Sequence, residues 1–211
     1  MKNTIIWDWN GTLLDDVGIC LEGINRLLRK RNLASLSLSH YREIFTFPVK
    51  NYYMAAGFNF DREPFEVPAA EFISHYAQLL PKASLFGDVE SILSHFNAKG
   101  FRQFILSAME QDTLRKSVQD MGIAHFFEQI CGIDDHFAHS KLERAKKMME
   151  AAAIRRGEAV MIGDTLHDVE VAAGIGVEII LIARGHQSPE RLTGAGTKLL
   201  PDLLALNGKV C

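Results

Sequence analysis

The sequence predicts an α/β fold, a doubly wound parallel sheet with helices on both faces and an all-helical segment inserted after the first strand. Short apolar runs alternate with helical patterns from about residue 83 onwards. Such alternation is typical of parallel sheets that are covered on both sides. Between residues 15 and 82 the alternation stops, because helical patterns follow one another without a strand. We therefore expect an α/β core formed by residues 1–14 and 83–211, and a helical insertion formed by residues 15–82.

The strands of the core are predicted from five apolar runs that have the length of buried parallel strands. These runs are residues 4–8 (TIIWD), 101–107, 128–132, 159–164 and 177–183. The covering helices are predicted from stretches with apolar residues three or four positions apart, namely 87–99, 110–121, 141–153 and 167–174. In the first of these stretches, for example, Val89, Ile92, Leu93 and Phe96 fall on one helix face.

The helical insertion has its own pattern. Helices are predicted over residues 17–32, 39–46, 48–56 and 68–80, and the segment is rich in Phe and Tyr. These aromatic side chains are sufficient for a small separate core, and Pro81 and Gly87 bracket a plausible linker back to the sheet. An insertion at this point lies over the carboxyl ends of the strands, where open α/β sheets bind their ligands.

The composition excludes several classes of protein. The chain has 211 residues, of which 47% are hydrophobic and 23% charged, and its formal net charge is −3. This charge gives no electrostatic reason to expect nucleic acid or an anionic membrane as a partner. Three widely separated cysteines favour reduced thiols, and no apolar run approaches the roughly 20 residues that span a bilayer. We expect a soluble cytoplasmic protein, and its oligomeric state stays open.

Polar residues occur at the points where the predicted strands end and helices begin. They are Asp8, Gly11 and Thr12, then Ser107, then Lys141, and finally Asp164 and Asp168. The carboxyl ends of parallel strands meet at one edge of a sheet, so we expect these residues to converge. Together they offer a carboxylate nucleophile, further carboxylates for a hard cation, and a hydroxyl and a lysine for phosphate oxygens. Phosphoryl transfer needs that combination.

The order D-x-x-G-T, strand-end Ser, Lys at a helix start and G-D-x-x-x-D resembles the haloacid dehalogenase (HAD) superfamily over essentially the whole chain. The helical insertion is similar to the helical cap of its phosphoglycolate phosphatase-like members. The resemblance implies a Rossmann-like core, Mg²⁺ as cofactor and a small phosphorylated metabolite as substrate. It therefore implies a phosphatase.

The resemblance also implies a role for each residue. Asp8 would attack phosphorus and form an aspartyl-phosphate. The implied metal ligands are Asp8, Asp164 and the backbone carbonyl of Asn10, with Asp168 in support. The implied phosphate-binding residues are Gly11, Thr12, Ser107 and Lys141, with the backbone amides around Gly11 completing the cradle.

Asn10 departs from the pattern, because relatives have an aspartate there that serves as general acid and then as general base. The amide can still offer its backbone carbonyl to a metal, but its side chain cannot deliver a proton. We therefore predict that Asn10 occupies the position of the catalytic acid and base, and that turnover is slow because its side chain cannot transfer a proton. The nearest alternative bases in the sequence are Asp15, Asp16 and His167.

Two alternatives stay open at this point. Asp8 and Trp9 followed by a non-acidic residue also resemble phosphonoacetaldehyde hydrolases, which cleave a carbon–phosphorus bond with a Schiff-base lysine, and Lys50 lies near that position. The other alternative is a degenerate, non-catalytic member that binds a phosphorylated ligand or a partner. We further expect the loop with Phe47 and Lys50 to face the site and to determine selectivity.

Overall fold

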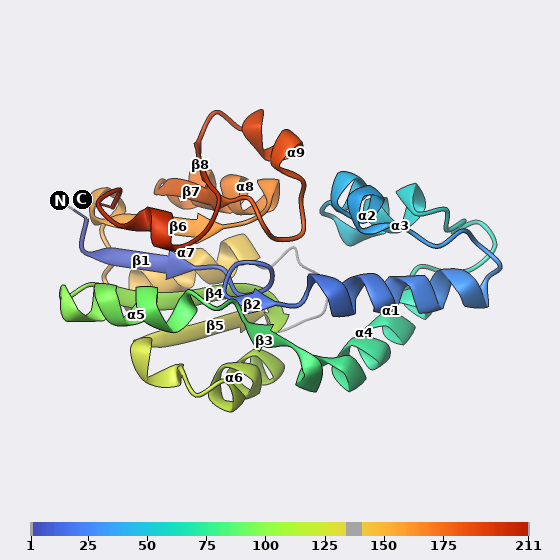
Figure 1. The fold of residues 1–211 in the computed structure, drawn as a ribbon, viewed down its shortest axis with the longest axis horizontal. Helices are drawn as coiled ribbons and strands as arrows, with labels where there is room; N and C mark the ends of the chain where they lie inside the picture. The colour runs from blue at the N-terminus through green and yellow to red at the C-terminus, as the bar shows by residue number, and fades with distance from the viewer. Residues whose placement is uncertain (1, 134–140, 211) are drawn as a thin grey trace.

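The computed structural model describes residues 2–133 and 141–210. Its core is a six-stranded parallel sheet in the order β5-β4-β1-β6-β7-β8 (Figure 1). The strands are β1 (Thr4–Trp7), β4 (Arg102–Glu110), β5 (Gln129–Ile133), β6 (Ala159–Gly163), β7 (Glu178–Ile182) and β8 (Lys198–Leu200). The chain leaves β1 first towards one edge and then returns to fill the other, so the predicted doubly wound fold is confirmed.

Alternate side chains of β1 enter two different hydrophobic clusters, as the two faces of a buried strand require. Ile5 and Trp7 belong to one cluster, together with residues of α5 (Val89–Ala98) and α6 (Gln111–Asp120). Ile6 belongs to the other, together with residues of α7 (Lys141–Ala151) and α8 (Leu166–Ile175). Both faces of the sheet are therefore covered by helices.

The core of the structure differs from the prediction in two respects. β4 continues three residues past its expected end at Ser107, with an irregular register against β5 between Leu106 and Glu110. The strand β8 and the short helix α9 (Pro189–Thr193) were not predicted, because so few residues carry too little periodicity. Single 3₁₀ turns occupy Leu80–Lys82, Ala124–Phe126, Arg156–Glu158 and Leu204–Leu206.

The helical insertion contains α1 (Val17–Lys30), α2 (Leu38–Ile44), α3 (Val49–Ala55) and α4 (Glu66–Leu79). Its buried side chains form a third hydrophobic cluster that includes Tyr41, Tyr52, Tyr53, Phe58 and Phe65. Two short antiparallel strands, β2 (Leu14–Asp15) and β3 (Ser84–Leu85), join its entry to its exit. Figure 1 shows the insertion beyond the arrowhead of β1, while both chain termini lie at the opposite end of the sheet. We propose that residues 15–82 act as a cap.

Among the described residues, no helix combines the length and the apolar character that crossing a bilayer demands.

Candidate active site

Asp8, Lys141 and Asp168 form one buried charged cluster at the carboxyl end of β1. Asp8 directly follows β1, and its backbone N–H continues the sheet by donating to the carbonyl of Ile162 at 2.8 Å. The Nζ of Lys141 lies 2.5 Å from Oδ1 of Asp8 and 2.7 Å from Oδ1 of Asp168. These three side chains are at most 8% exposed. Burial alone would lower the pKa of Lys141, but the two carboxylates outweigh it and raise that pKa, so the residue stays an ammonium.

The second carboxylate motif is ordered by the start of α8. Thr165 is the N-cap of this helix and forms a capping box with Asp168, which explains the spacing of this T-x-x-D sequence. Oδ2 of Asp168 accepts hydrogen bonds from the backbone N–H groups of Asp164 and Thr165 and from the hydroxyl of Thr165. Both oxygens of Asp168 are therefore engaged by protein donors.

Carboxylate oxygens of Asp8, Asp164 and Asp168 lie within 4.8 Å of one another. Burial, reinforced by the Asp168 charge, raises the pKa of Asp8 well above its ordinary value. Burial and the Asp168 charge also raise the pKa of Asp164 to about 6, although His186 opposes this. Three buried carboxylates against one ammonium leave an excess of negative charge, and oxygen ligands suit a hard divalent cation. The residues present thus fit a metal ion of that class.

The turn after β1 supports Asp164. The hydroxyl of Thr12 donates to Oδ1 of Asp164 at 3.0 Å. Gly11 has a φ of 73°, and a Cβ there would lie 2.4 Å from Oδ2 of Asp164, so only glycine fits. The backbone N–H of Gly11 donates to Asp16 at 3.0 Å. In this structure Gly11 and Thr12 thus donate hydrogen bonds to neighbouring carboxylates. Their contacts with phosphate stay a prediction.

Ser107 and Asn10 meet beside this cluster. The hydroxyl of Ser107, which is 1% exposed, donates to Oδ1 of Asn10 at 3.3 Å. The side-chain nitrogen of Asn10 lies 2.8 Å from Oδ2 of Asp16 and 2.9 Å from the hydroxyl of Tyr76 on α4. The structure therefore brings the predicted residues together, and it orients the amide of Asn10 by a contact with the helical insertion.

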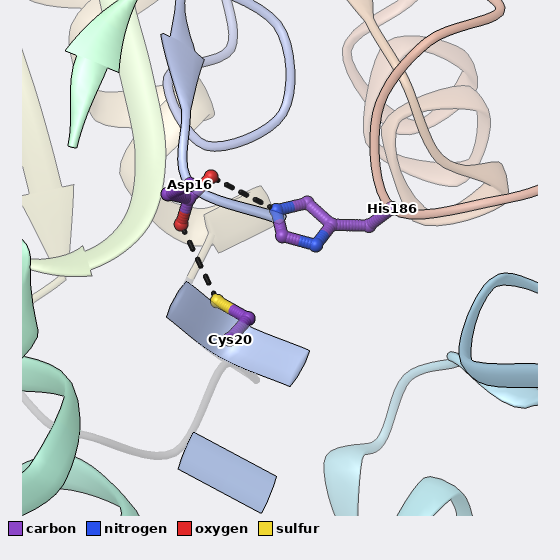
Figure 2. A group of neighbouring side chains, drawn as sticks. All are labelled: Asp16, Cys20 and His186. Atoms are coloured by element: carbon purple, nitrogen blue, oxygen red, sulfur yellow. Dashed lines mark hydrogen bonds and ion pairs between the residues drawn. The ribbon is translucent and has the colours of Figure 1, made fainter. Parts of the chain in front are cut away.

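Asp16, in the turn that leads into α1, is the centre of a second buried network (Figure 2). One of its oxygens lies 3.2 Å from Nε2 of His186, and the other accepts from the thiol of Cys20 at 3.4 Å. The backbone N–H of His186 donates to Asp164 at 2.6 Å, and its Nδ1 lies 2.8 Å from the hydroxyl of Tyr41. This network connects the helical insertion to the carboxylates of Asp8, Asp164 and Asp168 through the contact between His186 and Asp164.

Asp16 and His186 form an ion pair at neutral pH. Burial alone would raise the pKa of Asp16, but His186 and the hydrogen bonds from Asn10 and Tyr76 lower it below its ordinary value. Burial alone would lower the pKa of His186, but Asp16 and the other nearby carboxylates raise it to about 9. The pair is buried, since Asp16 is 0% and His186 4% exposed.

Sequence reasoning missed His186, Tyr76 and Tyr41. His186 comes shortly after β7, so the rule that residues beyond parallel strand ends converge could have identified it. Tyr76 and Tyr41 gave no such signal, because their position depends on how the helical insertion packs. His167, a suggested base, stacks its ring on Phe47 with 4.6 Å between centroids, and its Nδ1 lies 3.1 Å from Glu170.

A cavity of about 520 Å³ extends from Asp8 to the helices of the insertion. Phe47 lines it, as expected, but Lys50 does not: that side chain is exposed, and its Nζ lies 5.6 Å from the ring centre of Phe60. The expectation for Lys50 was wrong, because position along the sequence does not fix which way a side chain leaves a short helix. Lys141 is the single lysine that lines the cavity among the described residues, so the structure offers no cap lysine for a Schiff base.

Comparison with known proteins identifies the family of the chain. The sequence pattern of the haloacid dehalogenase-like hydrolases matches residues 5–182, which include the sheet from β1 to β7 and the helical insertion. The chain belongs to this family. It is accordingly a hydrolase with a HAD-like fold, and the resemblance inferred from its motifs is confirmed.

Individual relatives of this HAD-like hydrolase are distant but cover most of its length. A phosphoglycolate phosphatase from Rhodospirillum rubrum is 23% identical over 197 residues, which are 88% of this chain and 81% of that protein. A phosphoglycolate phosphatase from Colwellia psychrerythraea is 25% identical over 207 residues, covering 92% and 90%. The structure of a haloacid dehalogenase-like hydrolase from Streptococcus pneumoniae superposes with a TM-score of 0.86 at 19% identity, covering 99% and 98%. That superposition establishes the shared fold.

Proposed function

We propose that this HAD-like hydrolase is a Mg²⁺-dependent phosphatase that cleaves a small phosphorylated metabolite through an aspartyl-phosphate on Asp8. The observation that carries the proposal is the buried cluster of Asp8, Lys141 and Asp168 beside a cavity that Asp8 and Lys141 line. The curated relatives named phosphoglycolate phosphatase support the same reaction class and make phosphoglycolate a natural first compound to test.

The reaction has two displacements at phosphorus. An oxygen of Asp8 attacks phosphorus while the bond to the ester oxygen breaks, and the leaving alkoxide takes up a proton from water. Water then attacks phosphorus and gives up a proton to the solvent, the bond between phosphorus and the oxygen of Asp8 breaks, and inorganic phosphate is released. The ammonium of Lys141 and the hydroxyl of Ser107 donate to phosphoryl oxygens in both steps.

The metal ion would be held by Asp8, Asp164 and the backbone carbonyl of Asn10. Asp168 would support the site by fixing the backbone at Asp164 and by holding Lys141. When bound, the cation neutralises negative charge on the phosphoryl oxygens.

Asn10 makes this enzyme slow. Its amide has no proton to transfer, and its N–H groups already face Asp16 and Tyr76. A positioned general acid or base typically contributes about 10²–10⁴-fold. Alkyl phosphates, whose alkoxides need a proton, should therefore be poor substrates, and acyl phosphates should be better. Water activation in the second step is handicapped as well, so the phosphoenzyme should accumulate.

The test is hydrolysis of acetyl phosphate with Mg²⁺, in parallel with excess chelator and with Asp8→Asn. We expect turnover with Mg²⁺, none with chelator, and less than about a hundredth of the wild-type rate for Asp8→Asn, because it lacks the nucleophile. Asp120→Asn makes the same chemical change at an exposed carboxylate that does not line the cavity and should retain the rate. A quenched wild-type sample should show the mass of one added phosphoryl group. Full activity in chelator, or in Asp8→Asn, would contradict the proposal.

A further inference from the structure

The cavity above Asp8 has an unusual lining for a site that is expected to take a small anion. Away from the charged cluster most of its wall residues are aromatic or aliphatic, and they include Phe47, Tyr52, Phe65, Phe72 and Ile73. Its volume of about 520 Å³ falls within the range of pockets that enclose drug-sized ligands, roughly 300–1,000 Å³. The space therefore suits a substrate with a large apolar body beyond the phosphate.

The charges around the cavity also disfavour a small substrate that carries a second negative group. Among the described residues no arginine lines it, and its single lysine, Lys141, is paired with Asp8 and Asp168. Glu66 and Glu110 also line it, and the carboxylate of Glu110 caps α6 by accepting from the backbone N–H groups of Asp112 and Thr113. A second negative group on the substrate would thus find no uncommitted lysine or arginine among the described residues that line the cavity.

His186 does not change this balance. It lines the cavity, but its Nε2 lies 3.2 Å from the buried carboxylate of Asp16. His167 also lines the cavity, with its Nδ1 3.1 Å from Glu170 and its ring against Phe47. Each imidazole therefore has an acidic partner already.

We propose, on the basis of the phosphatase function above, that the natural substrate class is organic phosphates whose organic group carries a bulky apolar ring. Phosphoglycolate and other small esters with a carboxylate are poor substrates of this cavity. Burying one phenyl-sized group against the aromatic wall should raise kcat/KM roughly 10²-fold, because apolar area leaves water.

The experiment compares esters with matched leaving groups. 2-Phenylethyl phosphate and ethyl phosphate both release a primary alkoxide, so a difference between them reports the cavity rather than leaving-group chemistry. We expect kcat/KM to be about 10²-fold higher for 2-phenylethyl phosphate than for ethyl phosphate, and phosphoglycolate to be no better than ethyl phosphate. Equal values for the two alkyl esters, or a preference for phosphoglycolate, would overturn the proposal.

A variant pair on α4 tests the wall itself. Ile73 lines the cavity and is 37% exposed, whereas Val67 is 43% exposed on the same helix and does not line it. Ile73→Arg introduces a cation at the wall and should reduce the 2-phenylethyl-to-ethyl ratio at least about tenfold. Val67→Arg makes a comparable change outside the cavity and should preserve the ratio. Equal ratios in both variants would mean that this wall does not contact the substrate.

Failure of the reaction and failure of the selectivity can be told apart. If acetyl phosphate and both alkyl esters are not hydrolysed, the proposed function is wrong. The apolar-ring proposal is then tested by measuring binding. Calorimetry with Mg²⁺ should then show 2-phenylethylphosphonate binding at least about tenfold more tightly than ethylphosphonate. Equal affinities would overturn the apolar-ring proposal independently of turnover.

Discussion

The side-chain amide of Asn10 donates a hydrogen bond of 2.8 Å to the carboxylate of Asp16, which is fully buried. Asn10, which stands where the resemblance implies an aspartate, is therefore structurally coupled to a second carboxylate. An aspartate at position 10 would face Asp16 at hydrogen-bond distance, and two buried carboxylates at that distance cannot both ionise. Restoring the proton donor thus requires a change at both positions.

We predict that Asn10→Asp alone lowers the melting temperature and gains less than tenfold in turnover of ethyl phosphate. The double variant Asn10→Asp/Asp16→Asn keeps a hydrogen bond between the two positions, with the donor now at residue 16. It should increase ethyl phosphate turnover at least about tenfold over wild type, since a general acid is present again. Asp16→Asn alone is the control for the change at position 16. A double variant that is no faster than wild type would show that Asn10 does not limit the reaction.

A second prediction concerns the pH dependence of stability. The pKa of His186 is about 9 in the folded protein, above its ordinary 6.5. Its pairing therefore stabilises the fold fully below about pH 6.5, and this contribution is lost as pH rises through 9. On the acid side it persists until Asp16 is protonated, below the ordinary carboxyl pKa, because the pKa of Asp16 is lowered. The shift in the pKa of His186 corresponds to a contribution to the free energy of unfolding on the order of 3 kcal/mol.

Urea unfolding with chelator at about pH 6 and pH 9.5 measures this contribution. The stability difference between wild type and His186→Asn should be largest at the lower pH and shrink by most of that amount at the higher pH. Asp16→Asn should remove the same pH-dependent component, because it removes the partner. A difference that does not change with pH would contradict the ion pair.

The strand-end residues could be predicted from the sequence because the geometry of parallel sheets determines where they go. Asp8 and Asp164 follow central strands β1 and β6, and any doubly wound sheet brings those ends together. Lys141 was expected near them for the same reason, as the first residue of a helix after a strand. The convergence of these residues required no knowledge of side-chain packing.

The partners of Asp16 could not be predicted in this way. Its contact with His186 spans 170 positions, and the contact with Tyr76 depends on how α4 packs against α1. Which side chain meets which in such a network is decided by tertiary packing. The same cause explains why Phe47 lines the cavity as expected and Lys50 does not. Lys50 lies in α3, which is only seven residues long, and Phe47 lies just before it, so the directions of both side chains depend on how this short helix packs against the aromatic cluster.

A third prediction follows from the position of Lys141 between Asp8 and Asp168. Lys141→Met leaves two buried carboxylates without their cation and should destabilise the protein by about 3–5 kcal/mol in chelator. Because a ligand that binds the folded state stabilises it, Mg²⁺ should raise the melting temperature more in this variant than in wild type. Lys146→Met, on the exposed side of the same helix, is the matched control and should respond to Mg²⁺ as wild type does. An identical Mg²⁺ response in Lys141→Met and wild type would argue that the carboxylates do not bind the ion.

The last prediction concerns the start of α3, where Phe47 lies just before the helix and Lys50 in its first turn, and it assigns selectivity to Phe47. Phe47 lines the cavity and stacks on His167, whereas Lys50 points to Phe60 outside it. Phe47→Ala removes apolar wall, so the KM for 2-phenylethyl phosphate should rise about tenfold, a larger change than in the KM for acetyl phosphate, which has no ring to bury. Lys50→Ala should change neither value, because its side chain does not reach the substrate. Steady-state kinetics of the two variants on the two compounds measures this difference. If Phe47→Ala affects both substrates equally, the ring supports the fold of the insertion and does not recognise the substrate. If Lys50→Ala has the larger effect, the loop turns its other face to the site when a ligand binds.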